Sequence, residues 1–181
     1  GTPHHRFGVT QALGSCEANH GPMGRLDLVD NLFKFSPQAS HDTEGWPTFR
    51  SWPAADALTH EGLYYKWLER AWQAGLRIFV TNLVENETLC NLVKVSKGRP
   101  LANCNEMESA VTQIEYVKQL ESYIDAQEGG PGKGWFRIVT SPAEARKVIN
   151  EGKLAVVLGI EISHLFNCGI KLGQNLCDEA E

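Results

Sequence analysis

The most regular alternation of apolar and polar positions follows Asn105. Apolar side chains recur there three and four positions apart, the spacing of one face of a helix. Asn105 is a predicted N-cap, and Glu108 stands three positions later, where it can reciprocate the cap. The predicted apolar face consists of Met107, Val111, Ile114, Val117, Leu120 and Ile124. We therefore predict a long helix that ends at the glycine-rich stretch EGGPGKGW.

Three apolar segments predict strands. LRIFVTN reads as a buried strand that ends near Thr81, and WFRIVT as a short strand. KLAVVLGIE is continuously apolar, which is typical of a parallel strand covered on both faces. Between the last two lies SPAEARKVINEG, a predicted helix with Ser141 as cap, Pro142 in first place and Gly152 as stop. EGGPGKGW lacks the residues of a phosphate-binding loop and reads as a turn.

Further helices are predicted earlier in the chain. THEGLYYKWLERAWQAG has helical spacing from Thr59 and a stop at Gly75, and Glu85–Val95 has the same character. From residue 59 onward helices and strands therefore alternate, which predicts an α/β fold with parallel strands. Residues 1–58 are rich in loops, with one short helix expected at Leu26–Phe35. The expected organisation is an irregular region over 1–58 and an α/β segment over 59–181.

Composition narrows the function classes. The chain has 181 residues, 42% of them apolar and 22% charged, as in globular proteins. We expect no membrane-spanning segment, because no apolar run approaches about 18 residues. The net charge is −5, and no basic stripe is present. Nucleic acid and anionic membrane surfaces are therefore not expected partners.

The five cysteines match no zinc-finger spacing or redox motif. Cys90 and Cys104 bracket one loop, Cys168 and Cys177 bracket another, and a disulfide can close either. Asn86 begins an Asn-Glu-Thr glycosylation pattern, which has meaning in a secreted glycoprotein. These features favour an extracellular or secreted protein with disulfides. The alternative is a cytosolic protein with free thiols and a chance glycosylation pattern. In the secreted, disulfide-bearing interpretation Cys16 is left over, either free or joined to something outside this chain.

Glu161 ends the last predicted strand, and His164 follows three positions later. In parallel α/β folds the carboxyl ends of the strands share one edge, where binding sites are built. A carboxylate there can bind a metal, act as a base or pair with an arginine. The structural alternative is a Glu161 that accepts backbone N–H groups and a His164 that only packs.

The stretch SPAEARKVINEGKLAVVLGIEISHLFNCG resembles the membrane (renal) dipeptidase family of metal-dependent amidohydrolases. RAWQAGLRIFVTNLVENETLCNLV also looks like an often secreted branch of that group. The resemblance implies a TIM-like (α/β)₈ barrel with two zinc ions, which hydrolyses a small peptide-like or amide substrate with a zinc-activated water. On that template Glu161 matches the carboxylate that bridges the metals, and His164 matches a histidine near the substrate.

The chain also departs from that family pattern. The family supplies two ligands as His-x-Asp, which this sequence lacks, and two histidines from later strands. Ile162 and Ser163 replace the usual glycines. We expect either a fragment whose remaining ligands lie in another segment or chain, or a non-catalytic binding or structural domain derived from the same barrel.

Two other groups of residues have candidate binding chemistry. A loop cluster could bind a metal, although polar loop residues are the better interpretation; it consists of His4, His5, Cys16 and His20. Trp67 belongs to the apolar stripe of its predicted helix, which indicates core packing. Trp46 and Trp52 lie beside prolines, and their role stays open.

Overall fold

The computed structural model describes residues 65–91, 104–171, 174–175 and 177. The predicted loop-rich region 1–58, its short helix Leu26–Phe35 and the Thr59 cap lie outside these residues. The chain divides into two compact units, Gly1–Leu76 and Arg77–Glu181.

The described part of the first unit is helix α4 (Tyr65–Gln73), which ends in a turn at Gly75. Gly75 has φ +112°, a left-handed conformation that glycine adopts without a steric penalty. Its N–H donates to the carbonyl of Trp72, and the N–H of Leu76 donates to that of Ala71. The predicted helix stop is therefore confirmed. Trp67, expected on the apolar stripe, is partly buried.

The second unit is built on a parallel three-stranded sheet. Its strands are β1 (Ile78–Val84), β2 (Phe136–Ile138) and β3 (Leu154–Glu161), in the order β1-β3-β2. β1 pairs with β3 along its whole length, from Ile78 opposite Ala155 to Val84 opposite Glu161. The parallel α/β prediction is confirmed, whereas the predicted strand end near Thr81 is wrong. β1 continues to Val84 because its last three residues have partners in β3.

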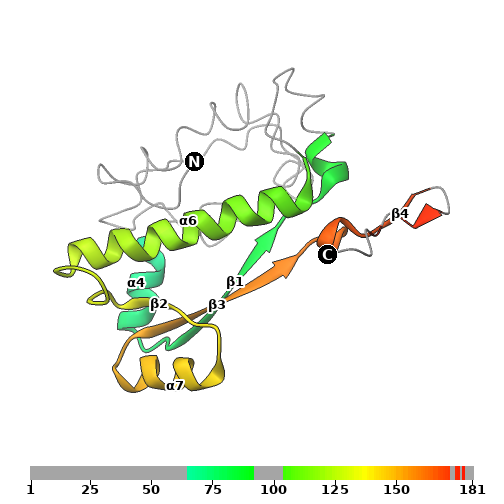
Figure 1. The fold of residues 1–181 in the computed structure, drawn as a ribbon. Coiled ribbons are helices and arrows are strands. Elements are labelled where there is room, and N and C mark those ends of the chain that lie inside the picture. Colours follow the sequence, from blue (N-terminus) through cyan, green and yellow to red (C-terminus); the bar gives the residue numbers. More distant parts are fainter. Residues whose placement is uncertain (1–64, 92–103, 172–173, 176, 178–181) are drawn as a thin grey trace, which may run out of the picture. The chain divides into compact units, whose positions relative to one another are not determined.

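Helices α6 (Glu106–Gln127) and α7 (Pro142–Asn150) cover opposite faces of the sheet (Figure 1). The strand order explains this arrangement. The chain passes through α6 from β1 to the far side of β3, then returns through α7 to the central position. Right-handed connections in opposite directions place their helices on opposite faces. The described residues thus form an open sheet between two helical layers, and the (α/β)₈ barrel stays a prediction.

The core lies on both faces of β3, whose first three residues are completely buried. On one face Ala145 of α7 packs with Val139 and Ala155, and partly buried apolar side chains surround them. The largest fully buried side chains of the described residues are Leu83, Ile124, Phe136, Leu154 and Val156. Burial of each of these side chains stabilises the fold by about 1.5–3 kcal/mol relative to an exposed position. Leu154 and Val156 belong to β3, and their burial accounts for the continuous apolar character of that strand.

The buried face of α6 differs from the predicted stripe at its N-terminal end. Val117, Leu120 and Ile124 are buried as expected, whereas Val111 is 54% exposed. Ala110 is buried instead, together with Glu106. Neighbouring positions on a helix point about 100° apart, so this shift rotates the buried face away from Val111. No described helix is both long enough and apolar enough to cross a bilayer.

The predicted caps are present. Asn105 Oδ1 accepts the N–H of Glu108 at 2.9 Å. Ser141 Oγ accepts the N–H of Glu144 at 3.2 Å, with Pro142 in the first turn. Gly152 follows the end of α7 with φ +77°. These local signals mark the start of both helices and the end of α7.

The glycine-rich stretch after α6 is a turn that encloses a carboxylate of its own chain. Asp125 accepts the N–H groups of Gly132 at 2.8 Å and Gly134 at 2.7 Å, and it forms an ion pair with Arg137 at 3.1 Å. Burial by itself would raise the pKa of Asp125, but these donors and the guanidinium outweigh it and lower that pKa. The turn is therefore structural, as predicted.

Candidate functional site

The carboxyl ends of β1 and β3 bring polar side chains together at one edge of the sheet. Glu161, the last residue of β3, is exposed there. Asn82 of β1 donates from Nδ2 to Glu161 Oε2 at 3.3 Å, across 79 positions of sequence. The structure thus places the predicted site carboxylate at the predicted edge, beside a neutral amide.

Gly159 provides room for this contact. It lies opposite Asn82 in the register of β1 and β3. A Cβ atom at position 159 would overlap Asn82 Oδ1. The glycine two positions before Glu161 therefore has a local steric reason, which does not depend on any ligand.

His164 lies in the loop after β3, immediately before the short 3-10 helix η3 (Leu165–Asn167). Its ring contacts two glutamates, since Nδ1 lies 3.6 Å from Glu87 Oε2 and 3.7 Å from Glu106 Oε1. The side chain is 40% exposed. His164 and Glu161 come to the same edge, but the interactions of the imidazole are with Glu87 and Glu106.

Glu106 is a buried carboxylate that the sequence patterns did not single out. It is 2% exposed and accepts the N–H of Glu87 at 2.9 Å and of His164 at 2.6 Å, with a further backbone hydrogen bond from Ser163. Burial would raise the pKa of Glu106, but the three backbone donors outweigh it and lower that pKa. The structural role considered for Glu161 is therefore performed by Glu106.

One sequence signal was available for Glu106. It stands in the first helical position after the Asn105 cap, where a negative charge is favourable. That signal explains a glutamate at this position but not its burial. Its backbone donors come from two loops that are distant in sequence, and no local pattern contains them.

The loop after β1 is held by its own polar side chains. Asn86 Oδ1 accepts the N–H of Leu89 at 2.9 Å and so caps the helical residues 87–91. Its Nδ2 donates to Ser163 Oγ at 3.4 Å, next to the loop of β3. Glu85 accepts the N–H of Asn86 and the hydroxyl of Ser109. Asn86 thus has a structural role, and its glycosylation stays a prediction.

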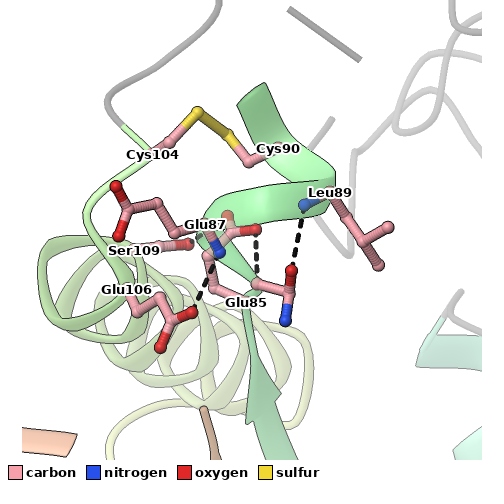
Figure 2. The surroundings of a disulfide bond; sticks show 8 residues. Glu85, Glu87, Leu89, Cys90, Cys104, Glu106 and Ser109 are labelled. Carbon is pink, nitrogen blue, oxygen red and sulfur yellow. Dashed lines mark hydrogen bonds between the residues drawn. A yellow bond between two sulfur atoms is a disulfide. The ribbon is translucent and has the colours of Figure 1, made fainter. Parts of the chain in front are cut away.

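The predicted disulfide between Cys90 and Cys104 is present, with a Cα–Cα distance of 5.6 Å (Figure 2). It joins the helical residues after β1 to the segment that enters α6. Glu106 lies beside it and accepts the N–H of Glu87 (Figure 2). The predicted helix Glu85–Val95 is confirmed over 87–91, and its remainder lies outside the described residues.

Cys168 and Cys177 are thiols in this structure. They flank the antiparallel strands β4 (Ile170–Lys171) and β5 (Gln174–Asn175). Cys16 lies outside the described residues, as does the rest of the loop cluster weighed for metal binding, His4, His5 and His20. Trp46 and Trp52 also lie outside them.

A protein-bound metal ion needs several ligating side chains close together. Within the described ranges, no three His, Cys, Asp or Glu side chains are grouped so that they could hold a metal ion. Glu161 fits one ligand position, because it is exposed and its partner is a neutral amide. Glu106 does not fit, since backbone N–H groups already occupy its oxygens.

A separate apolar groove of about 540 Å³ lies beside α7 and includes neither Glu161 nor His164. Ile78, Val157 and Ile149 form part of its lining. Comparisons of this chain with protein-family models, with curated proteins and with solved structures find no match.

Proposed function

We propose that this chain contributes part of the site of a dipeptidase-like, metal-dependent hydrolase. Glu161 would be a metal ligand, and His164 would lie near a small peptide-like or amide substrate. The observation that carries the proposal is the exposure of the Glu161 carboxylate and its single neutral partner among the described residues. Glu161 is an exposed carboxylate at the carboxyl end of a parallel strand, and its partner is the neutral Asn82 side chain at 3.3 Å.

The contrast between two carboxylates supports this assignment. Glu106 is buried and accepts backbone N–H groups, so its charge is used within the fold. Glu161 receives one long side-chain hydrogen bond and faces solvent. A carboxylate with accessible oxygens on a rigid strand end can coordinate a cation at little cost to the fold.

The neighbours of Glu161 are suited to supporting roles. Asn82 Nδ2 can hold one carboxylate oxygen in place while the other binds a cation, as outer hydrogen bonds do in metal sites. The backbone of His164 is anchored on Glu106, and its half-exposed ring can reach a substrate amide. Zinc, when bound, would lower the pKa of its water and polarise the scissile carbonyl.

The proposal includes a TIM-like barrel and further ligands from outside the described residues. In such a barrel, consecutive strands lie side by side and the helices form an outer ring. In the described sheet β3 lies between β1 and β2, so these three strands do not have the order of a barrel. β2 is three residues long and pairs with the first part of β3. The remaining strands would come from another segment or chain.

We also propose an extracellular or secreted location. The Cys90–Cys104 disulfide supports it, because disulfides persist in oxidising compartments. Secretion of the tagged full chain, with the disulfide intact in the medium, is the expected result. Retention in the cytosol with reduced cysteines would contradict it.

One observation favours a second candidate, a non-catalytic α/β binding or structural domain. Across the described ranges, metal-ligating side chains do not gather in threes. The two candidates make opposite predictions about metal content, so one measurement separates them.

The test is metal binding by the complete protein, with the segment or chain that supplies the remaining ligands present, measured by elemental analysis and by calorimetric titration with zinc. Glu161→Gln should remove binding and dipeptide turnover, because it removes the charge but keeps the shape. Glu115→Gln is a matched control on the exposed face of α6 and should change neither. Retention of metal and turnover by Glu161→Gln would reject the proposal, and absence of zinc binding by the complete, unaltered protein would favour the non-catalytic candidate.

A further inference from the structure

Two cysteines flank the paired strands β4 and β5. Ile170 pairs with Asn175, and Lys171 pairs with Gln174. Cys168 stands two positions before Ile170 and Cys177 two positions after Asn175, so the same register extended beyond the strands would bring the two cysteines opposite each other. Directly opposite residues of antiparallel strands have Cα atoms about 4.5–5.5 Å apart. A disulfide needs a Cα separation of about 4.4–6.8 Å, so this register is compatible with an S–S bond.

The side chains of the two residues are in contact. The thiol of Cys168 is hydrogen-bonded to Cys177, and this contact, with some burial, raises the pKa of Cys168. Oxidation is expected to become faster as the pH rises.

We propose that Cys168 and Cys177 are a dithiol that thiol–disulfide exchange converts into a second disulfide of this chain. The inference does not depend on the proposed hydrolase function. A disulfide is already present at Cys90–Cys104, so a disulfide donor that forms the first bond is also available to the second pair.

The exchange balances with a disulfide donor such as glutathione disulfide. The thiolate of one cysteine attacks a sulfur of the donor, forms a mixed disulfide and releases one glutathione thiolate. The second cysteine then attacks the protein sulfur of that mixed disulfide and releases the other glutathione. The protein loses two hydrogens, and the donor is reduced to two thiols that take up the two protons.

The bond would stiffen the segment that carries His164. The N–H of Cys168 donates to the carbonyl of Leu165 in η3. Asn167 accepts the side-chain N–H of Asn105, which ties η3 to the start of α6. Gly169 lies so close to the His164 ring that a Cβ atom there would be 2.5 Å from its Cδ2. A link between Cys168 and Cys177 would therefore tie the hairpin to this loop.

Trypsin provides a direct test, because it cleaves after Lys171, between the two cysteines. The full chain is equilibrated in glutathione buffers of decreasing GSH to GSSG ratio, alkylated, denatured and digested without reduction. The expected product is peptide Leu154–Lys171 linked to the peptide that begins at Leu172. Two alkyl labels should be lost from these peptides, and reduction should restore both.

The same digest contains its own control. Residues 78–94 and 98–118 are tryptic peptides that the Cys90–Cys104 bond joins. If this link is present while Cys168 and Cys177 are both alkylated at every buffer ratio, the proposal is rejected. A link of either cysteine to Cys16 would also reject it. Cys177→Ser should abolish the hairpin link and leave the Cys90–Cys104 link unchanged.

Discussion

The backbone N–H of His164 donates to Glu106 Oε2 at 2.6 Å, across 58 positions of sequence. The loop after β3 is thereby held by the first residue of α6. The same carboxylate accepts the N–H of Glu87 in the loop after β1. The segments that follow β1 and β3 at the carboxyl edge of the sheet thus share one buried anion, in addition to the hydrogen bond between Asn86 and Ser163.

Replacing Glu106 by Gln is expected to lower the free energy of unfolding by about 2–3 kcal/mol. Hydrogen bonds to a charged group contribute about 1.5–3 kcal/mol each, and the neutral amide also presents N–H groups where backbone donors already point. Urea unfolding of the two proteins measures the difference. Glu115→Gln, on the exposed face of α6, should stay within about 0.5 kcal/mol of the unaltered chain. An equal effect of both substitutions would contradict the role assigned to Glu106.

The stability of the fold is expected to decrease at acid pH. The pKa values of Glu106 and Asp125 are lowered from ordinary values of 4.5 and 3.8. Carboxylates of this kind contribute their full stability above the unfolded-state pKa, and the contribution is lost as the pH falls through the lower folded-state pKa. Unfolding free energies should therefore fall from about pH 5 downward.

Glu106→Gln and Asp125→Asn should each flatten this pH dependence, because each removes one titrating carboxylate. The slope is measured by urea unfolding at a series of pH values at constant ionic strength. Glu115→Gln, again the control, should keep the slope of the unaltered chain. A slope that neither buried-site substitution changes would mean that other groups control the acid transition.

Asn82 and Gly159 are expected to be energetically coupled. Gly159→Ala should destabilise the fold by about 1 kcal/mol, because its Cβ would overlap Asn82 Oδ1. The same substitution in an Asn82→Ala background should cost less, since the overlapping atom is gone. A double-mutant cycle measures the coupling, which should be about 0.5 kcal/mol or more. Strict additivity would contradict the contact.

Removing the disulfide by Cys90→Ser with Cys104→Ser should destabilise the chain by about 2–4 kcal/mol. The bond closes a loop with a sequence separation of 14, and a crosslink of this size restricts the unfolded state appreciably. Thermal unfolding with and without reductant measures the effect. If the unfolding midpoint of the unaltered chain were the same in both conditions, the assigned role of this crosslink would be wrong.

Local features of the sequence predicted the elements of this fold well. Asn105 and Ser141 cap their helices, and Gly75 and Gly152 stop theirs, because each acts through hydrogen bonds or backbone angles within a few residues. The apolar run that ends at Glu161 is a central strand, as its lack of alternation indicated. These properties depend on neighbours in the chain, which a single sequence displays.

Tertiary features could not be predicted in the same way. The position of β3 between β1 and β2 depends on pairing over long separations, and no local pattern encodes it. The burial of Glu106 depends on donors at Glu87 and His164, which come from different loops. Val111 has the apolar character of a core residue, yet the packed face of α6 excludes it.

The central position of β3 has a consequence for how the chain folds. In the described sheet β1 and β2 have no hydrogen bonds to each other, and both pair with β3. During synthesis Ile78 therefore emerges long before Ala155, its partner in the register. Pairings of such long range are slow to form, because loop closure must precede them. Of the three strands of this sheet, the one that carries Glu161 is synthesised last and joins the other two, so the candidate site and the described sheet should form in the same step.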